Sequence, residues 1–130
     1  MSKVVLDTSA VLAYLFNEAG ADEVYPVLEA GFGIISSVNY AELVGKLVDQ
    51  AMPIDVIRET LFDLELEVVE YNEAQAFATG TLRIVSKAFG LSLGDRACLA
   101  LGVVMNLPIL TADRVWLNVP LSTKVRVIRG

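Results

Sequence analysis

The stretch Val4-Val5-Leu6-Asp7-Thr8-Ser9 sets the organisation of the chain, because a short apolar run leads directly into an acidic residue. The β-branched run predicts a first strand over residues 4–6, and a helix is expected over residues 9–16. An aspartate at this junction is expected either to cap the helix or to act on a ligand beyond the end of the strand. On its own, Asp7 leaves both interpretations open.

The rest of the chain repeats this alternation of strand and helix. Further strands are expected over residues 33–36, 66–69, 108–111 and 125–128, with helices over 22–29, 39–51, 54–64, 73–89 and 93–105. Pro26 interrupts the first of these helices, and Gly80 weakens the fourth. The alternation predicts an α/β fold with three α/β/α layers, built on a central, mostly parallel sheet of about five strands.

Composition narrows the class of protein. The chain has 130 residues, 55% of them hydrophobic and 20% charged, which predicts one folded domain over residues 1–130. The absence of histidine excludes an imidazole base and a histidine-ligated zinc site, and the single cysteine, Cys98, excludes an internal disulfide. The net charge of −6 argues against binding duplex DNA through bulk charge. The acidity indicates either carboxylate chemistry or nothing beyond solubility.

No segment is typical of targeting or of membrane insertion. Met1-Ser2-Lys3 leads straight into the first strand, without an apolar core of signal-peptide length. The longest apolar stretch, residues 97–110, is broken by Asn106 and Pro108 and is too short to span a bilayer. We therefore expect a cytoplasmic protein with no membrane association.

Two further acids, Asp95 and Asp113, lie where local chemistry alone can explain them. Ser92 and Asp95 have the S-x-x-D spacing of a helix capping box, yet Asp95 also stands at the entrance of a helix that carries no charge over residues 97–105. Asp113 comes just after a strand, where turn formation explains an aspartate well. Each acid is expected either to stabilise its local structure or to face a cleft.

Glu42 is the weakest candidate by periodicity. Apolar residues recur along one side of the helix over 39–51, and Glu42 points roughly to the opposite side. This pattern favours a solvated surface glutamate. Its position favours a role in a site, because it lies in the first turn of a helix that follows a strand.

Taken together, four segments resemble the signature segments of the PIN domain, and more narrowly those of the bacterial VapC-type toxin ribonucleases. They occur in the order and at the spacing of that family: Val5-Leu6-Asp7-Thr8-Ser9-Ala10, Val38-Asn39-Tyr40-Ala41-Glu42-Leu43, Leu93-Gly94-Asp95-Arg96-Ala97-Cys98-Leu99-Ala100 and Leu110-Thr111-Ala112-Asp113-Arg114. The resemblance runs from near residue 3 to the C-terminus. It implies a single α/β/α domain that hydrolyses RNA phosphodiesters with Mg²⁺ or Mn²⁺.

The resemblance also implies which residues form the site. The metal-binding and catalytic acids are expected at Asp7, Glu42, Asp95 and Asp113. Small polar residues beside these acids are expected to support them, namely Thr8, Asn39 and Thr111. Mg²⁺ and Mn²⁺ are hard cations that prefer carboxylate and water oxygens, and this chemistry needs no histidine. Some members carry a further acid shortly after the fourth, where this chain has Arg114-Val115-Trp116, so one or two bound ions both remain open.

Partners follow from the same resemblance. VapC-type proteins are the toxins of type II toxin–antitoxin pairs, usually form homodimers and are inhibited by a small antitoxin that covers the acidic site. RNA contacts are expected at Arg96 and Arg114. Lys46, Arg83 and Lys87 are weaker candidates for RNA contact, and a solvated helix face is the favoured interpretation of these three. Five apolar residues are expected either in a helical dimer surface or in the core: Leu47, Val48, Ile54, Ile57 and Leu61.

Two alternative functions are considered, one of them without catalysis and the other enzymatic. A catalytically silent PIN-like module would bind RNA or a partner without cutting, and the presence of all four acids disfavours it. A phosphatase of the haloacid-dehalogenase type also begins with a strand that ends in aspartate. That chemistry needs a second acid two residues later, where this chain has Ser9.

Overall fold

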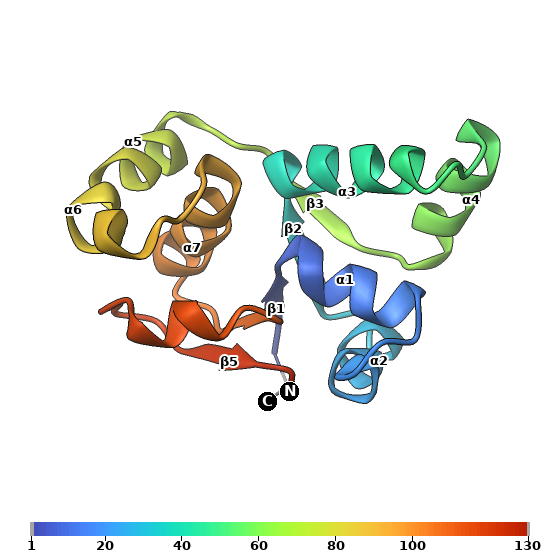
Figure 1. Cartoon of the computed structure of the whole chain (residues 1–130), viewed down its shortest axis with the longest axis horizontal. Coiled ribbons are helices and arrows are strands. Elements are labelled where there is room, and N and C mark those ends of the chain that lie inside the picture. Colours follow the sequence, from blue (N-terminus) through green and yellow to red (C-terminus); the bar gives the residue numbers. More distant parts are fainter. Residues whose placement is uncertain (1, 130) are drawn as a thin grey trace.

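The computed structural model describes residues 2–129 and contains a five-stranded parallel sheet between two layers of helices (Figure 1). The strands are β1 (Val4–Leu6), β2 (Gly33–Ser36), β3 (Glu67–Val69), β4 (Ile109–Thr111) and β5 (Val125–Val127). They lie in the order β3-β2-β1-β4-β5, and each neighbouring pair is parallel. The three-layer α/β/α prediction is therefore confirmed.

One face of the sheet packs against the first four helices. These are α1 (Thr8–Leu15), α2 (Ala21–Glu29), α3 (Ser37–Asp49) and α4 (Ile54–Asp63). Because side chains alternate along a strand, Leu6, Ile35 and Leu110 all point into this layer. The helices on this side appear from blue to green in Figure 1.

The opposite face of the sheet packs against the later helices. These are α5 (Glu73–Thr81), α6 (Arg83–Ser86), α7 (Leu93–Met105) and the 3₁₀ turns η1 (Lys87–Phe89) and η2 (Arg114–Asn118). Val5, Ile34 and Ile109, the alternate strand residues, point into this layer. Residues 97–102 of α7 are buried against them, whereas Val104 and Met105 at the end of the helix are exposed.

Two helices differ from the sequence-based expectation. The helix α2 continues through Pro26. Proline has no N–H for the carbonyl of Asp22, but Asp22 and Pro26 are both exposed, so water can bond to that carbonyl. The single helix expected over residues 73–89 is instead divided at Leu82 into α5, α6 and η1. Thr79 and Thr81 donate their hydroxyls to carbonyls three or four residues earlier in the chain, which competes with the regular backbone ladder. The carbonyl of Thr79 is itself taken by Arg96 at 2.9 Å.

The apolar residues considered for a dimer surface divide into two groups. Leu47, Ile57 and Leu61 are buried in the core, so the dimer-surface interpretation is wrong for these three. They face inward because α3 and α4 pack against each other and against the sheet. Val48 and Ile54 are exposed.

The strand order reverses between β1 and β4, since the chain adds β2 and β3 on one side of β1 and places β4 and β5 on the other. Open parallel sheets bind ligands beyond the carboxyl ends of the strands at such a point. Asp7 follows β1 directly, and Asp113 follows β4 after one intervening residue. Among residues 2–129, no helix combines the length and the apolar character needed to cross a membrane.

Leu101 in α7 tests the packing of the second layer. Its side chain is 0% exposed, so we expect Leu101→Ala to lower the free energy of unfolding by about 2–5 kcal/mol, through lost burial and a residual cavity. Urea unfolding followed by circular dichroism measures the change. Leu117→Ala is the matched control, because Leu117 is 55% exposed, and its effect should stay within about 1 kcal/mol. Equal effects of the two substitutions would contradict this packing.

Candidate acidic site

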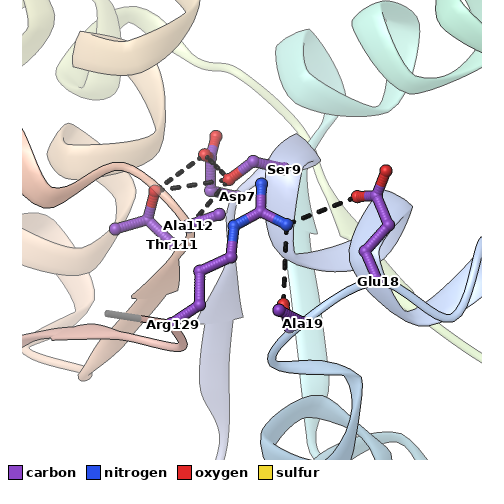
Figure 2. Close-up of polar contacts among 7 residues, drawn as sticks. All are labelled: Asp7, Ser9, Glu18, Ala19, Thr111, Ala112 and Arg129. Atoms are coloured by element: carbon purple, nitrogen blue, oxygen red, sulfur yellow. Dashed lines mark hydrogen bonds and ion pairs between the residues drawn. The ribbon is translucent and has the colours of Figure 1, made fainter.

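Asp7 is held at the end of β1 by hydroxyl groups rather than by a helix cap. Its side chain is 6% exposed, and its Oδ2 accepts hydrogen bonds from Ser9 Oγ at 2.6 Å and from Thr111 Oγ1 at 3.0 Å (Figure 2). No side-chain capping bond joins Asp7 to the first turn of α1. Asp7 therefore occupies the N-cap position of α1, as one interpretation expects, but its carboxylate turns toward β4 and does not cap the helix.

Ser9 is a supporting residue that the sequence analysis did not single out. Besides donating to Asp7, its Oγ accepts a hydrogen bond from the backbone N–H of Ala112 at 2.9 Å (Figure 2). It thereby ties α1 to the segment that follows β4. The only local signal was a small hydroxyl two residues after a strand-end acid, which is too common a pattern to carry a prediction.

Glu42 is not a freely solvated glutamate. Its Oε1 accepts hydrogen bonds from Asn39 Nδ2 at 2.9 Å and from Thr8 Oγ1 at 3.2 Å. Asn39 is fully buried, and its amide also donates to the carbonyl of Gly94 at 3.0 Å. This network joins the three helices α1, α3 and α7. Tertiary contacts therefore hold Glu42 in place, although the apolar periodicity of its helix favours a solvated position.

Gly94 leaves the space that the Glu42 carboxylate occupies. A Cβ atom added at Gly94 would lie 2.2 Å from Glu42 Oε2, which is far inside van der Waals contact. The backbone of Gly94 is in a helix and needs no positive φ. The absence of a side chain at this position therefore serves the approach of Glu42 to the first turn of α7.

Asp95 and Asp113 have both of the roles considered for them. Ser92 and Asp95 form the predicted capping box, with the backbone N–H of each donating to the side chain of the other at 3.0 and 3.1 Å. Asp113 Oδ1 accepts the backbone N–H of Val115 at 3.0 Å, as expected of a turn aspartate. Both acids also line the cavity described next.

One cavity of about 310 Å³ brings the four predicted acids together. Its lining residues are Asp7, Thr8, Ser9, Leu12, Glu42, Lys46, Ser92, Asp95 and Asp113. Asn39 and Thr111 do not line it, but they hold Glu42 and Asp7 by hydrogen bonds. A larger cavity of about 540 Å³ lies between α3, α4 and β3 and has a mostly apolar lining. The smaller cavity is the candidate functional site because the four acids line it.

Burial and mutual repulsion concentrate unfavourable negative charge in this cavity. The pKa of Asp7 is raised from 3.8 to about 6, mainly by desolvation and to a smaller extent by the charge of Asp95, against the lowering effect of the bonds from Ser9 and Thr111. Burial likewise raises the pKa of the Cys98 thiol, with added contributions from Asp7, Asp95 and Glu42. These three acids therefore act on the same point in the core.

The donor chemistry of the cavity fits a hard divalent cation. Each of the four carboxylates has one hydrogen-bonded oxygen, namely Asp7 Oδ2, Glu42 Oε1, Asp95 Oδ2 and Asp113 Oδ1. Among residues 2–129, no three acidic or cysteine side chains lie close enough to share one ion. Mg²⁺ requires fewer protein ligands than that, because it keeps several waters and binds through one or two carboxylates. Asp7 and Asp95, which both line the cavity, are two carboxylates that could serve in this way.

The two arginines predicted to contact RNA lie outside the cavity lining. Arg96 directs its Nη1 to the carbonyl of Thr79 on α5, and Arg114 is exposed at the start of η2. Lys46 is the only basic residue among the lining residues in the part of the chain that the structure describes. The favoured interpretation of Lys46 as part of a solvated helix face therefore misses its position beside the acids.

The fold and the carboxylate cavity at the strand-order reversal define an α/β/α protein with an acidic site. The PIN domain family model matches residues 4–120, and the chain belongs to the PIN domain family. A comparison with curated proteins finds no match.

Solved structures share this fold at low sequence identity. DNA-bound VapBC from Salmonella typhimurium has a TM-score of 0.70 and 20% identity, covering 98% of this chain and 99% of that one. A toxin–antitoxin complex from Klebsiella pneumoniae has a TM-score of 0.73 and 17% identity, covering 97% and 98%. VapBC-5 from Mycobacterium tuberculosis has a TM-score of 0.62 and 23% identity, with both chains covered completely. At these identities the similarity establishes the fold.

The raised pKa of Asp7 makes stability depend on pH in a defined direction. Between pH about 4 and about 6 the folded protein keeps a proton that the unfolded chain releases, so the free energy of unfolding falls as pH rises. The loss from this group totals about 3 kcal/mol and persists at neutral pH. We expect Asp7→Asn to remove this slope in urea unfolding with EDTA present, whereas Asp63→Asn, at an exposed position on α4, keeps it. The same slope in all three proteins would contradict the burial effect.

Proposed function

We propose that this protein is a divalent-metal-dependent endoribonuclease that hydrolyses RNA phosphodiester bonds. The observation that carries the proposal is the convergence of Asp7, Glu42, Asp95 and Asp113, from four separate segments, on one cavity at the strand-order reversal. Membership of the PIN domain family, whose members are typically nucleases, supports the same conclusion.

Hydrogen bonds fix one oxygen each of Asp7, Glu42 and Asp95 and leave the other for a ligand. Ser9 and Thr111 hold Asp7 Oδ2, and Thr8 and Asn39 hold Glu42 Oε1. The bond within the capping box holds Asp95 Oδ2. Orientation fixed before substrate arrives lowers the entropic cost of assembling the reacting groups.

Mg²⁺ or Mn²⁺ is the cofactor that these residues would hold, with Asp7 and Asp95 as the central pair and Glu42 and Asp113 beside them. When bound, such an ion acidifies an attacking water and offsets charge on the phosphate. The chain itself needs this cation, because buried and mutually repelling carboxylates would otherwise oppose an anionic substrate. Arg96 and Arg114 remain proposed RNA contacts outside the cavity.

We further propose that residues 1–130 act as a single-domain VapC-like toxin with a cognate antitoxin and as a homodimer. The support is the fold shared with VapBC and other toxin–antitoxin complexes. Val48 and Ile54 are the exposed members of the apolar set considered for the dimer surface.

A catalytically silent PIN-like module that binds RNA or a partner is the alternative function. Arg114, which is exposed and follows Asp113, would serve either function, since phosphate contacts by Arg position RNA with or without cleavage. The two functions differ in whether bound RNA is cut.

Metal-dependent cleavage is the direct test. Purified protein is incubated with end-labelled single-stranded RNA and Mn²⁺, and cleavage should disappear in EDTA. Asp7→Ala should lower the rate on the order of 100-fold or more, because it removes a central carboxylate. Asp63→Ala removes an exposed acid on α4 and should cut normally. Bound but intact RNA would overturn the enzyme in favour of the silent module.

Gly94→Ala should separate activity from stability. The added methyl group collides with the end of the Glu42 side chain, which is flexible and can move away. We therefore expect thermal unfolding to stay near the wild-type temperature while cleavage falls about 10- to 100-fold, as for other residues that orient a metal ligand.

Gly80→Ala is the matched control, since no atom lies within 4 Å of its added Cβ. Gly94→Ala should also add no further loss of activity in a Glu42→Ala background, because the two substitutions act through one carboxylate. Full activity of Gly94→Ala, or complete additivity with Glu42→Ala, would contradict the positioning of Glu42 described above.

A further inference from the structure

Lys46 lies one helical turn after Glu42 on α3 and lines the acidic cavity. Residues four apart on a helix share a face, so the Lys46 side chain starts on the same side of α3 as the Glu42 carboxylate. Lys46 is itself exposed. Its position therefore combines access from solvent with proximity to the acids.

The ammonium group of Lys46 is not committed to an acid of this chain. The ion pairs within residues 2–129 are Lys3–Glu67, Arg126–Glu23 and Arg129–Glu18, and none includes Lys46. Arg129 is turned to Glu18 and the carbonyl of Ala19 (Figure 2). Glu42, the natural helical partner of Lys46, already has its Oε1 engaged by Thr8 and Asn39 on the buried side.

Arg96 is another basic residue close in sequence to a candidate acid, but unlike Lys46 its side chain is hydrogen-bonded within the protein. It follows Asp95 in sequence, but its Nη1 donates to the Thr79 carbonyl at 2.9 Å and stabilises the break between α5 and α6. Releasing this guanidinium to bind a ligand would leave that carbonyl without its partner, at a cost that Lys46 does not incur.

We propose that Lys46 binds the scissile phosphate of RNA, donating from its ammonium group to a non-bridging oxygen. This inference rests on the proposed ribonuclease function and assigns one more residue to it. A lysine suits the role because its long flexible stem carries a compact charge to phosphate. It offsets the repulsion between an anionic substrate and a cavity lined by four acids.

The first test compares Lys46→Ala with Lys46→Arg and Lys124→Ala, a control at an exposed lysine outside the cavity. We expect Lys46→Ala to lower kcat/KM for RNA about 10- to 100-fold, the effect of losing one charged hydrogen bond. Lys46→Arg should restore most of the activity, and Lys124→Ala should change it less than about threefold. Melting temperatures should stay equal, because the Lys46 side chain is exposed.

RNA binding gives a second readout that needs no cleavage. In an Asp95→Asn background, adding Lys46→Ala should reduce the slope of log K against log salt by about 0.7, the value for one lost phosphate contact on a single strand. Adding Lys124→Ala should leave the slope unchanged.

Chemical rescue tests the charge itself. The only native cysteine, Cys98, is fully buried, so in Lys46→Cys a bromoethylamine reagent modifies position 46 selectively and recreates a lysine-like ammonium. Recovered cleavage after modification supports the proposal. Cleavage by Lys46→Ala equal to that of the wild type, or no recovery after complete modification, overturns it. A wild-type protein that cuts no RNA would instead contradict the proposed function.

Discussion

The burial of the Asp7 carboxylate at the end of β1 is the constraint on which the site depends. A buried carboxylate is unfavourable unless hydrogen bonds compensate for lost water, and here Ser9 and Thr111 provide them. Ser9 also accepts from the backbone of Ala112. The first strand, the first helix and the fourth strand are therefore fixed relative to one another by the same few atoms that orient the acid.

A second network of hydrogen bonds orients the Glu42 carboxylate in the same way. Thr8, Asn39 and the Gly94 carbonyl join α1, α3 and α7, so that three helices meet over the carboxyl ends of the strands. Two apolar layers, one on each face of the sheet, supply the stability that allows repelling acids to converge. Sites of this kind reduce stability locally, and the surrounding packing has to compensate.

Local signals in the sequence marked three of the candidate acids but left their roles open, and the resemblance to the PIN domain assigned all four to one site. Asp7 and Asp113 follow apolar strands, and Asp95 sits in an S-x-x-D pattern that the structure realises as a capping box. Glu42 was harder, because periodicity treats a residue facing away from the core stripe as solvated. Ser9 and Gly94 escaped notice because their roles are defined by atoms from distant segments.

The sequence by itself determined the alternation of strand and helix and the apolar character of residues 97–102 of α7, since these depend on short-range pattern and composition, whereas the choice of the four acids came from the resemblance of four segments to the PIN domain. Only the tertiary structure decided that Pro26 stays within a helix, that residues 73–89 divide at Leu82, and that Lys46 rather than Arg96 lines the cavity. Those outcomes depend on which groups from distant parts of the chain lie within hydrogen-bonding distance of a given carbonyl or carboxylate. Spacing along the chain does not encode that proximity.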